Sequence, residues 1–379
     1  MDFDLTEDHA EVRDLAAQIL GDLAQVERVV EVERNEGGFD ARLWETLASS
    51  GLIGIALSED VGGAGLGMGG LVALLEQQGR HVAPVPLWSV VAGAALPLAE
   101  FGSPAQVEQW VGPIIEGTAI VTGAFDAAPG QVARLTGLAV DGGLRVTGEL
   151  PQVPAAPVAQ AVVVPVTAED GGLRVALVPL DRAGVTVVPV AATSNESAGA
   201  IVFEDVVLTE DDLLPADGAT VTAWTRRRLR IALAAVALGV CEEDLRITAA
   251  YTSERVQFGR PVSTNQAVAV RATDAYLDTE AIRLTTHRAA WLLDNPEQGG
   301  EEPAEPASLV AKWWASVGGL RVVLAGQHLH GGIGADIDYP IHRYFLWGRQ
   351  VAFSFGSGDA IAAELGDVLP TAPRIGAPA

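Results

Sequence analysis

Four residues in one short segment have side chains or backbone suited to holding a phosphorylated ligand. The segment YTSERVQFGRPVSTNQ, residues 251–266, contains Arg255, Phe258, Gly259 and Gln266. A guanidinium stays charged and offers several fixed donors, which suits a diphosphate. The structural alternative is that Arg255 stabilises the end of the long helical pattern before it, because cations are favoured at helix C-termini. The segment by itself is compatible with both roles.

A second candidate site is the glycine-rich stretch HLHGGIGADIDYPIHRYF, which contains Gly331, Gly332 and Gly334. Missing side chains let backbone N–H groups approach a ligand closely. The alternative is that these glycines only end a helix. His328 and His330 stand two residues apart without a third ligand at metal spacing, so no zinc site is predicted.

Basic residues gather at the start of a predicted helix, in TRRRLR, and the chain has a single cysteine. Arg226, Arg227, Arg228 and Arg230 oppose the helix dipole there. They could bind a phosphate group of a ligand or an acidic partner, or form a solvated patch. Cys241 excludes an internal disulfide, and its apolar helical surroundings favour a buried small hydrophobe over a redox group.

Composition limits the possible partners and location. The chain has 379 residues, 49% of them hydrophobic, and a net charge of -25. Such a surface repels nucleic acid and anionic lipid, so neither is expected as a partner. The acidic start MDFDLTEDHAEV lacks a signal-peptide core, and no apolar run reaches the roughly 18 residues of a membrane span. We expect a cytoplasmic protein.

The chain divides into three predicted parts, which give an α+β fold class. Residues 1–117 show helical periodicity, with Thr6 as a helix N-cap. Residues 118–220 hold short Val- and Thr-rich strands, and DGGLRV occurs twice between strands, which indicates hairpins. Residues 221–379 contain long helical patterns typical of a bundle. A solvated loop from Pro296 and a disordered tail, PTAPRIGAPA, are also expected.

The order and spacing of several motifs resemble the acyl-CoA dehydrogenase family over more than 300 residues. FDARLWETLASSGLIGIALSEDVGGAGLG is similar to the family's N-terminal helix pair and glycine turn. VFEDVVL is similar to the strand that leaves its β-domain. RVQFGRPVSTNQ and HLHGGIGADIDYPIHRYF resemble its two signatures in the C-terminal bundle. The resemblance implies an N-terminal helical domain, a central β-barrel domain and a C-terminal four-helix bundle.

The resemblance also implies FAD as cofactor, held between the β-domain of one subunit and the bundle of its neighbour. Arg255 would reach the neighbour's flavin pyrophosphate, Phe258 would pack on the cofactor and Gln266 would hydrogen-bond it. The glycine turn would approach the adenosine half. The remaining cofactor-binding candidates are Gln327, His328, Gly331, Gly332 and Gly334. The family usually has glutamine where His328 stands, and here Gln327 lies one place early.

The β-domain departs from the family pattern where its own flavin would bind. The family's Thr-Glu-Pro…Gly-Ser-Asp stretch corresponds to TGAFDAAPGQVARL, which keeps none of that order. The following tryptophan and threonine motif corresponds to GELPQVPAA, which leaves Gln152 and Pro154 beside the flavin ring. Proline has no N–H to donate, and glutamine offers no comparable shielding face. We therefore expect this subunit's own flavin pocket to be disabled.

The proton-abstracting glutamate of the family is also missing. Members remove the α-proton of an acyl thioester with a positioned carboxylate. Its commonest location corresponds to Phe355, in SFGSGD, and its second location to Leu229, just before the matching Arg230. Arg230 is a candidate for substrate binding. Asp359 is the nearest substitute acid.

These features predict the non-catalytic subunit of an α2β2 acyl-CoA dehydrogenase, like the actinobacterial enzymes that shorten sterol side chains. The partner subunit would carry the glutamate, and electron-transfer flavoprotein is the expected acceptor. Three alternatives stay open: a self-sufficient homotetramer with a relocated base such as Asp359, a flavin oxidase or monooxygenase on the same scaffold, and an inert acyl-CoA-binding or scaffold protein.

Overall fold

The computed structural model describes residues 5–127, 131, 133–298 and 303–371. Residues 372–379, which include most of the tail expected to be disordered, lie outside this range, as do residues 299–302 of the predicted loop. Within the described residues, no helix is both long and apolar enough to cross a membrane.

The chain packs as two compact units, each made of segments that are distant in sequence. The first contains residues 1–26, 72–83 and 230–379, and the second contains residues 27–71 and 84–229. The helices α4 and α7 each contribute residues to both units. The sequence predicted three parts, with boundaries after residues 117 and 220, from the order of helical and strand-rich segments. This division into three parts stays a prediction.

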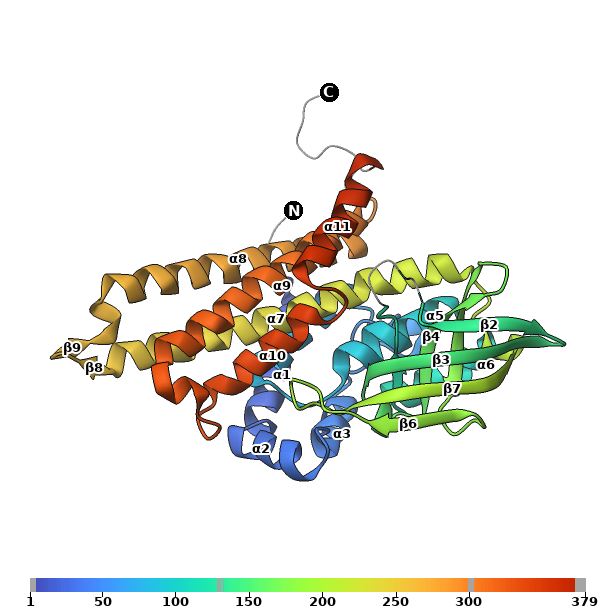
Figure 1. Cartoon of the computed structure of the whole chain (residues 1–379), viewed down its shortest axis with the longest axis horizontal. Helices are drawn as coiled ribbons and strands as arrows, with labels where there is room; N and C mark the ends of the chain where they lie inside the picture. The colour runs from blue at the N-terminus through green and yellow to red at the C-terminus, as the bar shows by residue number, and fades with distance from the viewer. Residues whose placement is uncertain (1–4, 128–130, 132, 299–302, 372–379) are drawn as a thin grey trace. The chain divides into compact units, whose positions relative to one another are not determined.

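The first unit is a helical bundle (Figure 1). Its helices are α1 (Glu7–Leu23), most of α4 (Gly67–His81), the C-terminal part of α7 (Gly218–Glu254), α8 (Gln266–Asp294), α9 (Ala304–His330), α10 (Ile341–Phe353) and α11 (Gly358–Val368). The short strands β8 (Val256–Gln257) and β9 (Arg260–Pro261) join α7 to α8. Thr6 caps α1 as predicted, since its side chain accepts a hydrogen bond from the His9 N–H.

The second unit surrounds a curled seven-stranded sheet with the order β1-β4-β2-β3-β7-β6, and β5 pairs with β4. The strands are β1 (Val121–Gly123), β2 (Leu135–Val140), β3 (Gly143–Pro154), β4 (Ala161–Ala168), β5 (Leu173–Pro179), β6 (Val185–Pro189) and β7 (Ala198–Thr209). Its helices are α2 (Val26–Asn35), α3 (Ala41–Ser49), a π-helix η2 (Trp88–Ala95), α5 (Leu96–Phe101) and α6 (Pro104–Ile115). The expected α+β class is confirmed, with a curled sheet as its central domain.

Both DGGLRV repeats form the predicted hairpins. The first joins β2 to β3 and the second joins β4 to β5, each pair being antiparallel. The sheet interior is a continuous apolar core around Val164, Phe203 and Leu208, which are all buried. This core fixes the sheet independently of any ligand.

Close backbone packing joins α4 to α7 in the bundle. A Cβ atom at Gly79 would lie 2.1 Å from the Val236 carbonyl oxygen, and one at Gly239 would lie 1.8 Å from the Glu76 carbonyl oxygen. Only glycine permits this approach. The hydrophobic pattern of α7 in the sequence did not predict that Gly79 and Gly239 determine the distance between α4 and α7.

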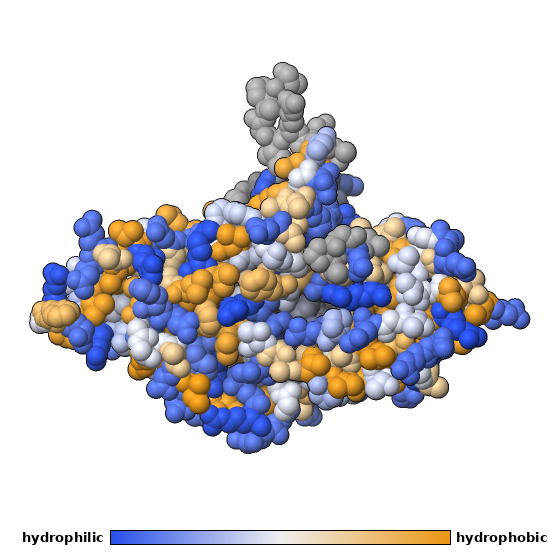
Figure 2. All heavy atoms as spheres, viewed as in Figure 1, coloured by the Kyte–Doolittle hydropathy of each residue, from blue (hydrophilic) through white to orange (hydrophobic). Residues whose placement is uncertain are grey.

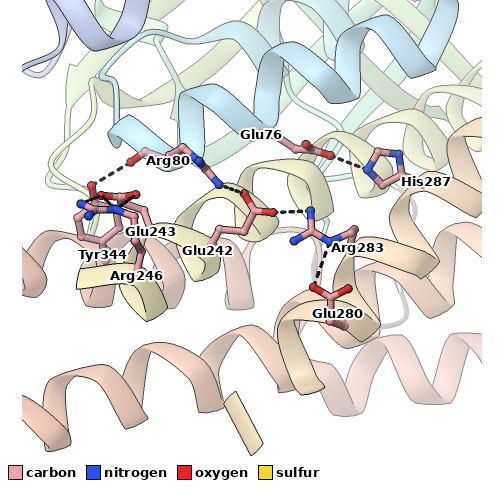
Figure 3. A network of polar contacts seen from close by, with 9 residues as sticks. All are labelled: Glu76, Arg80, Glu242, Glu243, Arg246, Glu280, Arg283, His287 and Tyr344. Atoms are coloured by element: carbon pink, nitrogen blue, oxygen red, sulfur yellow. Dashed lines mark hydrogen bonds and ion pairs between the residues drawn. The ribbon is translucent and has the colours of Figure 1, made fainter. Parts of the chain in front are cut away.

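An ion-pair network holds the same helices together (Figure 3). Glu242 of α7 lies 2.5 Å from both Arg80 of α4 and Arg283 of α8. His287 of α8 lies 2.8 Å from Glu76 of α4. Glu242 is nearly buried, so a change at this carboxylate would leave two cations without their shared partner.

We expect Gly239→Ala to lower the free energy of unfolding by about 1–3 kcal/mol, because the added methyl group forces α4 and α7 apart. Gly366→Ala is the matched control, since nothing lies within 4 Å of a Cβ atom at that position in α11. The control should be neutral or stabilising by up to about 1 kcal/mol. Chemical denaturation of both variants measures the difference, and equal stabilities would contradict the packing argument.

Candidate functional site

Arg255 lies at the exposed C-terminal end of α7, and its backbone N–H donates to the Tyr251 carbonyl at 2.8 Å. Within the described residues, its guanidinium has no hydrogen-bond or ion-pair partner. The helix end is therefore capped by the backbone of Arg255, and its side chain makes no hydrogen bond with a helix carbonyl. This leaves the cation available to a ligand outside this chain.

A tight hairpin follows Arg255 and presents Phe258 to solvent. Val256 pairs with Pro261 and Gln257 pairs with Arg260, so Phe258 and Gly259 alone form the turn. Both have positive φ, 53° and 78°. Such a two-residue turn favours glycine or asparagine, so a phenylalanine there carries backbone strain. The Phe258 side chain is also fully exposed, which means that none of its apolar surface is buried by this chain.

Gln266 is the first residue of α8 and is exposed. The hairpin brings the N-terminus of α8 back beside the C-terminus of α7, so Arg255 and Gln266 lie at the same end of the bundle (Figure 1). Backbone N–H groups at a helix N-terminus favour anions. Arg255 and Gln266 therefore flank the hairpin that joins α7 to α8, and their joint contact with a cofactor stays a prediction.

The glycine turn begins where α9 ends, and each glycine in it has a different local role. Gly331 has φ 62° and ψ −136°, a conformation open essentially to glycine. A Cβ atom at Gly334 would lie 2.5 Å from the Gln327 carbonyl oxygen, whereas nothing lies within 4 Å of one at Gly332. Gly332 is thus exposed with free space around it, as close approach by a ligand requires.

Gln327 and His328 differ in their surroundings. The Gln327 side chain donates to the Gly334 carbonyl at 3.2 Å and so holds the turn in shape. His328 is exposed. The buried imidazole is His330, whose spacing from His328 raised only the question of a metal site. Its ring stacks on Tyr251, with 4.4 Å between the ring centroids. No group of three or more His, Cys, Asp and Glu in the described part of the chain could hold a metal ion.

The two positions that the sequence predicts to correspond to a catalytic base are both buried and apolar. Leu229 is completely buried, and one of its methyl groups would lie 3.4 Å from a Cβ atom at Gly93 of η2. Phe355 is also buried and has φ 57°, a strained conformation for an aromatic residue. Asp359 is exposed in the first turn of α11, where a carboxylate suits the helix dipole without any catalytic role.

The β-domain positions expected beside a flavin ring are filled by contacts within the second unit. The Thr122 hydroxyl donates to the Pro154 carbonyl at 2.7 Å. A Cβ atom at Gly123 would lie 2.3 Å from the Gly93 carbonyl oxygen, so η2 packs directly on β1. Gln152 is exposed on β3. These residues do not fit an aromatic wall for a flavin ring, whereas the residues at the bundle end fit the diphosphate half.

The arginine cluster lies further into α7 than the sequence suggested. The helix begins at Gly218, so the prediction that these arginines oppose the dipole at a helix start was wrong. Arg228 stacks over Trp224, with its guanidinium carbon 3.2 Å from the ring centroid. Arg226 and Arg227 each have a polar or electrostatic contact in the structure.

Arg230, the candidate for substrate binding, lies inside the bundle. Its side chain is 1% exposed and forms ion pairs with Glu305 of α9, at 2.6 Å, and with Glu364 of α11. Two carboxylates thus neutralise a buried cation that ties three helices together. This geometry accounts for Arg230 without substrate, and substrate binding by Arg230 stays a prediction.

Cys241 is buried on α7 against α9. Burial raises the pKa of its thiol, and nearby carboxylates, among them Glu242, act in the same direction. A thiol held in its neutral form is a poor nucleophile. The thiol therefore has the environment of a packing residue, as expected.

Family models and relatives match nearly the whole chain. The model for the N-terminal domain of acyl-CoA dehydrogenases matches residues 6–118, and the model for the C-terminal domain matches residues 216–366. Acyl-CoA dehydrogenase FadE27 of Mycobacterium tuberculosis is 34% identical over 376 residues, which cover 98% of this chain and 100% of the relative. Acyl-CoA dehydrogenase FadE28 of the same organism is 28% identical, covering 91% and 92%.

Two solved structures are similar over almost their full length. A chain of the Tcur3481-Tcur3483 steroid ACAD, G363A variant, is 41% identical with a TM-score of 0.87, covering 96% of this chain and 98% of that one. A chain of the ChsE4-ChsE5 complex from Mycobacterium tuberculosis is 34% identical with a TM-score of 0.91, covering 99% and 100%.

We expect Arg230→Ala to lower the free energy of unfolding by about 3 kcal/mol, because it removes a buried cation from between two carboxylates. Arg13→Ala removes an exposed arginine that pairs with Asp14 and should change stability by less than about 0.5 kcal/mol. Thermal and chemical denaturation test this difference. An Arg230→Ala protein of normal stability with weakened acyl-CoA binding would instead support a substrate contact.

Proposed function

The chain belongs to the acyl-CoA dehydrogenase family of flavin-dependent oxidoreductases acting on CH–CH bonds, and from this premise we propose that it is the non-catalytic subunit of an α2β2 enzyme. One contrast carries the proposal. At the bundle end, Arg255 has no partner among the described residues and Gly332 has open space around it, while both positions predicted for a catalytic base hold buried apolar side chains.

In this proposal the bundle end completes an FAD site whose β-domain half comes from the partner subunit. Arg255 neutralises the diphosphate, and Gln266 donates a hydrogen bond to it beside the N-terminus of α8. Phe258 packs on the cofactor, which buries its exposed ring. The backbone N–H groups near Gly332 lie against the adenosine half. The chemistry that bound FAD supplies is acceptance of a hydride from the Cβ atom of the acyl group.

The proton acceptor then comes from the partner subunit. Abstraction of an α-proton needs a carboxylate within hydrogen-bond reach of the substrate. Leu229 and Phe355 cannot accept a proton, and η2 packs against Leu229 where a substrate would have to approach it. Turnover by this chain therefore depends on a partner that carries the glutamate.

An exposed apolar seam on α8 supports assembly with a second subunit. Val270, Leu277 and Leu284 are each about half exposed and recur every seven residues, so they follow one face of the helix. In Figure 2, apolar side chains interrupt the hydrophilic surface over the bundle. Contiguous exposed apolar surface of this kind marks protein interfaces.

The similar chains are consistent with this assembly. The ChsE4-ChsE5 structure is a complex, and the Tcur3481-Tcur3483 structure, which also carries two chain names, is a steroid ACAD. A steroid side-chain CoA ester is therefore the proposed substrate class, and electron-transfer flavoprotein the proposed acceptor. The cytoplasmic location expected from the sequence belongs to the same proposal.

The alternatives predict different behaviour of the purified chain. A self-sufficient dehydrogenase, oxidase or monooxygenase would bind FAD when purified alone, and the dehydrogenase would reduce an acceptor with an acyl-CoA. An inert acyl-CoA-binding protein would leave a partner dehydrogenase unaffected. Under our proposal the isolated chain is colourless, and turnover appears only with the partner.

We expect Arg255→Ala to reduce the FAD content of the co-expressed complex and to weaken FAD binding about 10-fold or more, because a charge-assisted contact to a diphosphate is lost. Arg246→Ala, an exposed arginine on the same helix, is the control and should leave FAD binding unchanged. Absorbance of bound flavin per purified complex is the measurement. Equal flavin content in both variants would rule out Arg255 as a cofactor ligand.

We expect Leu277→Glu to prevent assembly with the partner, because it places a charge in the apolar seam of α8. Leu138→Glu is the matched control: Leu138 is 56% exposed on β2 and Leu277 is 59% exposed. Light scattering after size-exclusion chromatography gives the mass of each complex. If both variants retain the wild-type mass, the α8 seam is not the interface.

A further inference from the structure

Three buried polar atoms on the contacting helices α7 and α9 lack hydrogen-bond partners among the described residues. The atoms are Asp244 Oδ1, Thr248 Oγ1 and His330 Nε2, and none has a partner among the described residues. The three side chains are only 1%, 2% and 3% exposed, respectively. Each such atom, left unsatisfied, costs about 1–3 kcal/mol. Three of them on facing helices indicate that something else satisfies them.

Contacts along the two helices place these atoms on facing surfaces. A Cβ atom at Gly326 would lie 2.0 Å from Asp244 Oδ2, so the carboxyl group occupies the space that this glycine leaves on α9. One turn further along α9, His330 stacks on Tyr251. Thr248 stands one turn after Asp244 and one turn before Tyr251, on the same face of α7. Asp244 and Thr248 on α7 and His330 on α9 therefore lie at successive turns along the contact between the two helices.

The chemistry of the three groups is complementary to water. His330 Nδ1 lies 2.8 Å from the Gly326 carbonyl, which can only accept, so Nδ1 carries the proton and Nε2 is an acceptor. Burial lowers the pKa of His330, which keeps the ring neutral. Burial raises the pKa of Asp244, which favours a protonated carboxyl that can both donate and accept. A threonine hydroxyl can also do both.

His330 connects this cluster to the proposed cofactor contacts. The Tyr251 hydroxyl donates to the His330 carbonyl at 3.4 Å, immediately before Gly331. Tyr339, which follows the glycine turn, packs against His330 with ring centroids 5.4 Å apart. The Tyr251 carbonyl in turn accepts from the Arg255 N–H. The ring stack therefore fixes both the glycine turn and the start of the Arg255 hairpin.

We propose that Asp244, Thr248 and His330 line an internal water-binding site, and that this bound water holds His330 as a positioning residue for the two cofactor-binding segments. Ordered buried waters usually make two to four hydrogen bonds to polar groups that otherwise lack partners, and these three side chains offer such groups. The positioning role rests on the proposed function, whereas the presence of water does not. No group in the cluster needs to touch substrate or cofactor.

The water itself is tested by a high-resolution crystal structure of this chain, alone or in its complex. We expect an ordered water within hydrogen-bond distance of Thr248 Oγ1 and His330 Nε2. The proposal would be overturned if no ordered water lies between these atoms, or if the side chains rotate so that the atoms hydrogen-bond directly to one another. This result does not depend on whether the chain binds FAD.

The positioning role is tested in the co-purified complex with Thr248→Val, which removes one hydroxyl while keeping the side-chain shape. We expect the dissociation constant for FAD to rise about fivefold with the mass of the complex unchanged. Thr248→Ser should restore it. Thr252→Val is the matched control, since that hydroxyl bonds only to carbonyls of its own helix.

Unchanged FAD affinity in Thr248→Val, or equal effects of Thr248→Val and Thr252→Val, would contradict the positioning role. If the wild-type complex binds no FAD at all, the proposed function fails, and the crystal structure still decides whether the water is present. His330→Phe provides a second variant: it keeps a ring in the stack but removes both nitrogens, and it should weaken FAD binding at least as much as Thr248→Val.

Discussion

The unpartnered guanidinium of Arg255 is the feature on which the account depends. In a chain of net charge -25, carboxylates are abundant, and arginines such as Arg28, Arg182 and Arg321 lie against them. Arg255 instead stands at an exposed helix end with no partner in the described part of the chain, next to a strained hairpin that exposes Phe258. An exposed cation and an exposed aromatic ring on neighbouring residues are complementary to an anionic, partly aromatic ligand. In the proposed function, the rest of the binding site for this ligand comes from another subunit.

The packing of the second unit supports the proposal that the cofactor site is shared with a partner subunit. Where the family places a flavin ring, the Thr122 hydroxyl is engaged by Pro154, and η2 lies against β1 at a backbone distance that only Gly93 and Gly123 allow. Leu229 packs into the same region. Restoring a carboxylate at Leu229 would therefore bury an unpaired charge and would not by itself create an active base. The apolar packing of this unit and the exposed Arg255 and Phe258 at the bundle end are both consistent with the proposed role of a subunit that contributes to another subunit's site.

Much of this organisation could be predicted from local sequence, because local chemistry determines it. The Thr6 cap, the two DGGLRV hairpins and the common location of Arg255 and Gln266 all follow from short-range patterns. Long-range packing could not be predicted in this way. The position of Arg230 inside the bundle depends on Glu305 and Glu364, which are distant in sequence. The role of His330 depends on a ring stack with Tyr251, and nothing in the spacing of the two residues indicates it.

Native mass spectrometry of the complex co-purified with its partner tests the central claim most directly, because it counts chains and flavins in the same particle. We predict that one complex contains two copies of each chain and two FAD molecules, and that this chain carries no FAD when it is purified alone. Four FAD molecules per four chains, or a fully flavin-loaded homotetramer of this chain, would contradict this prediction.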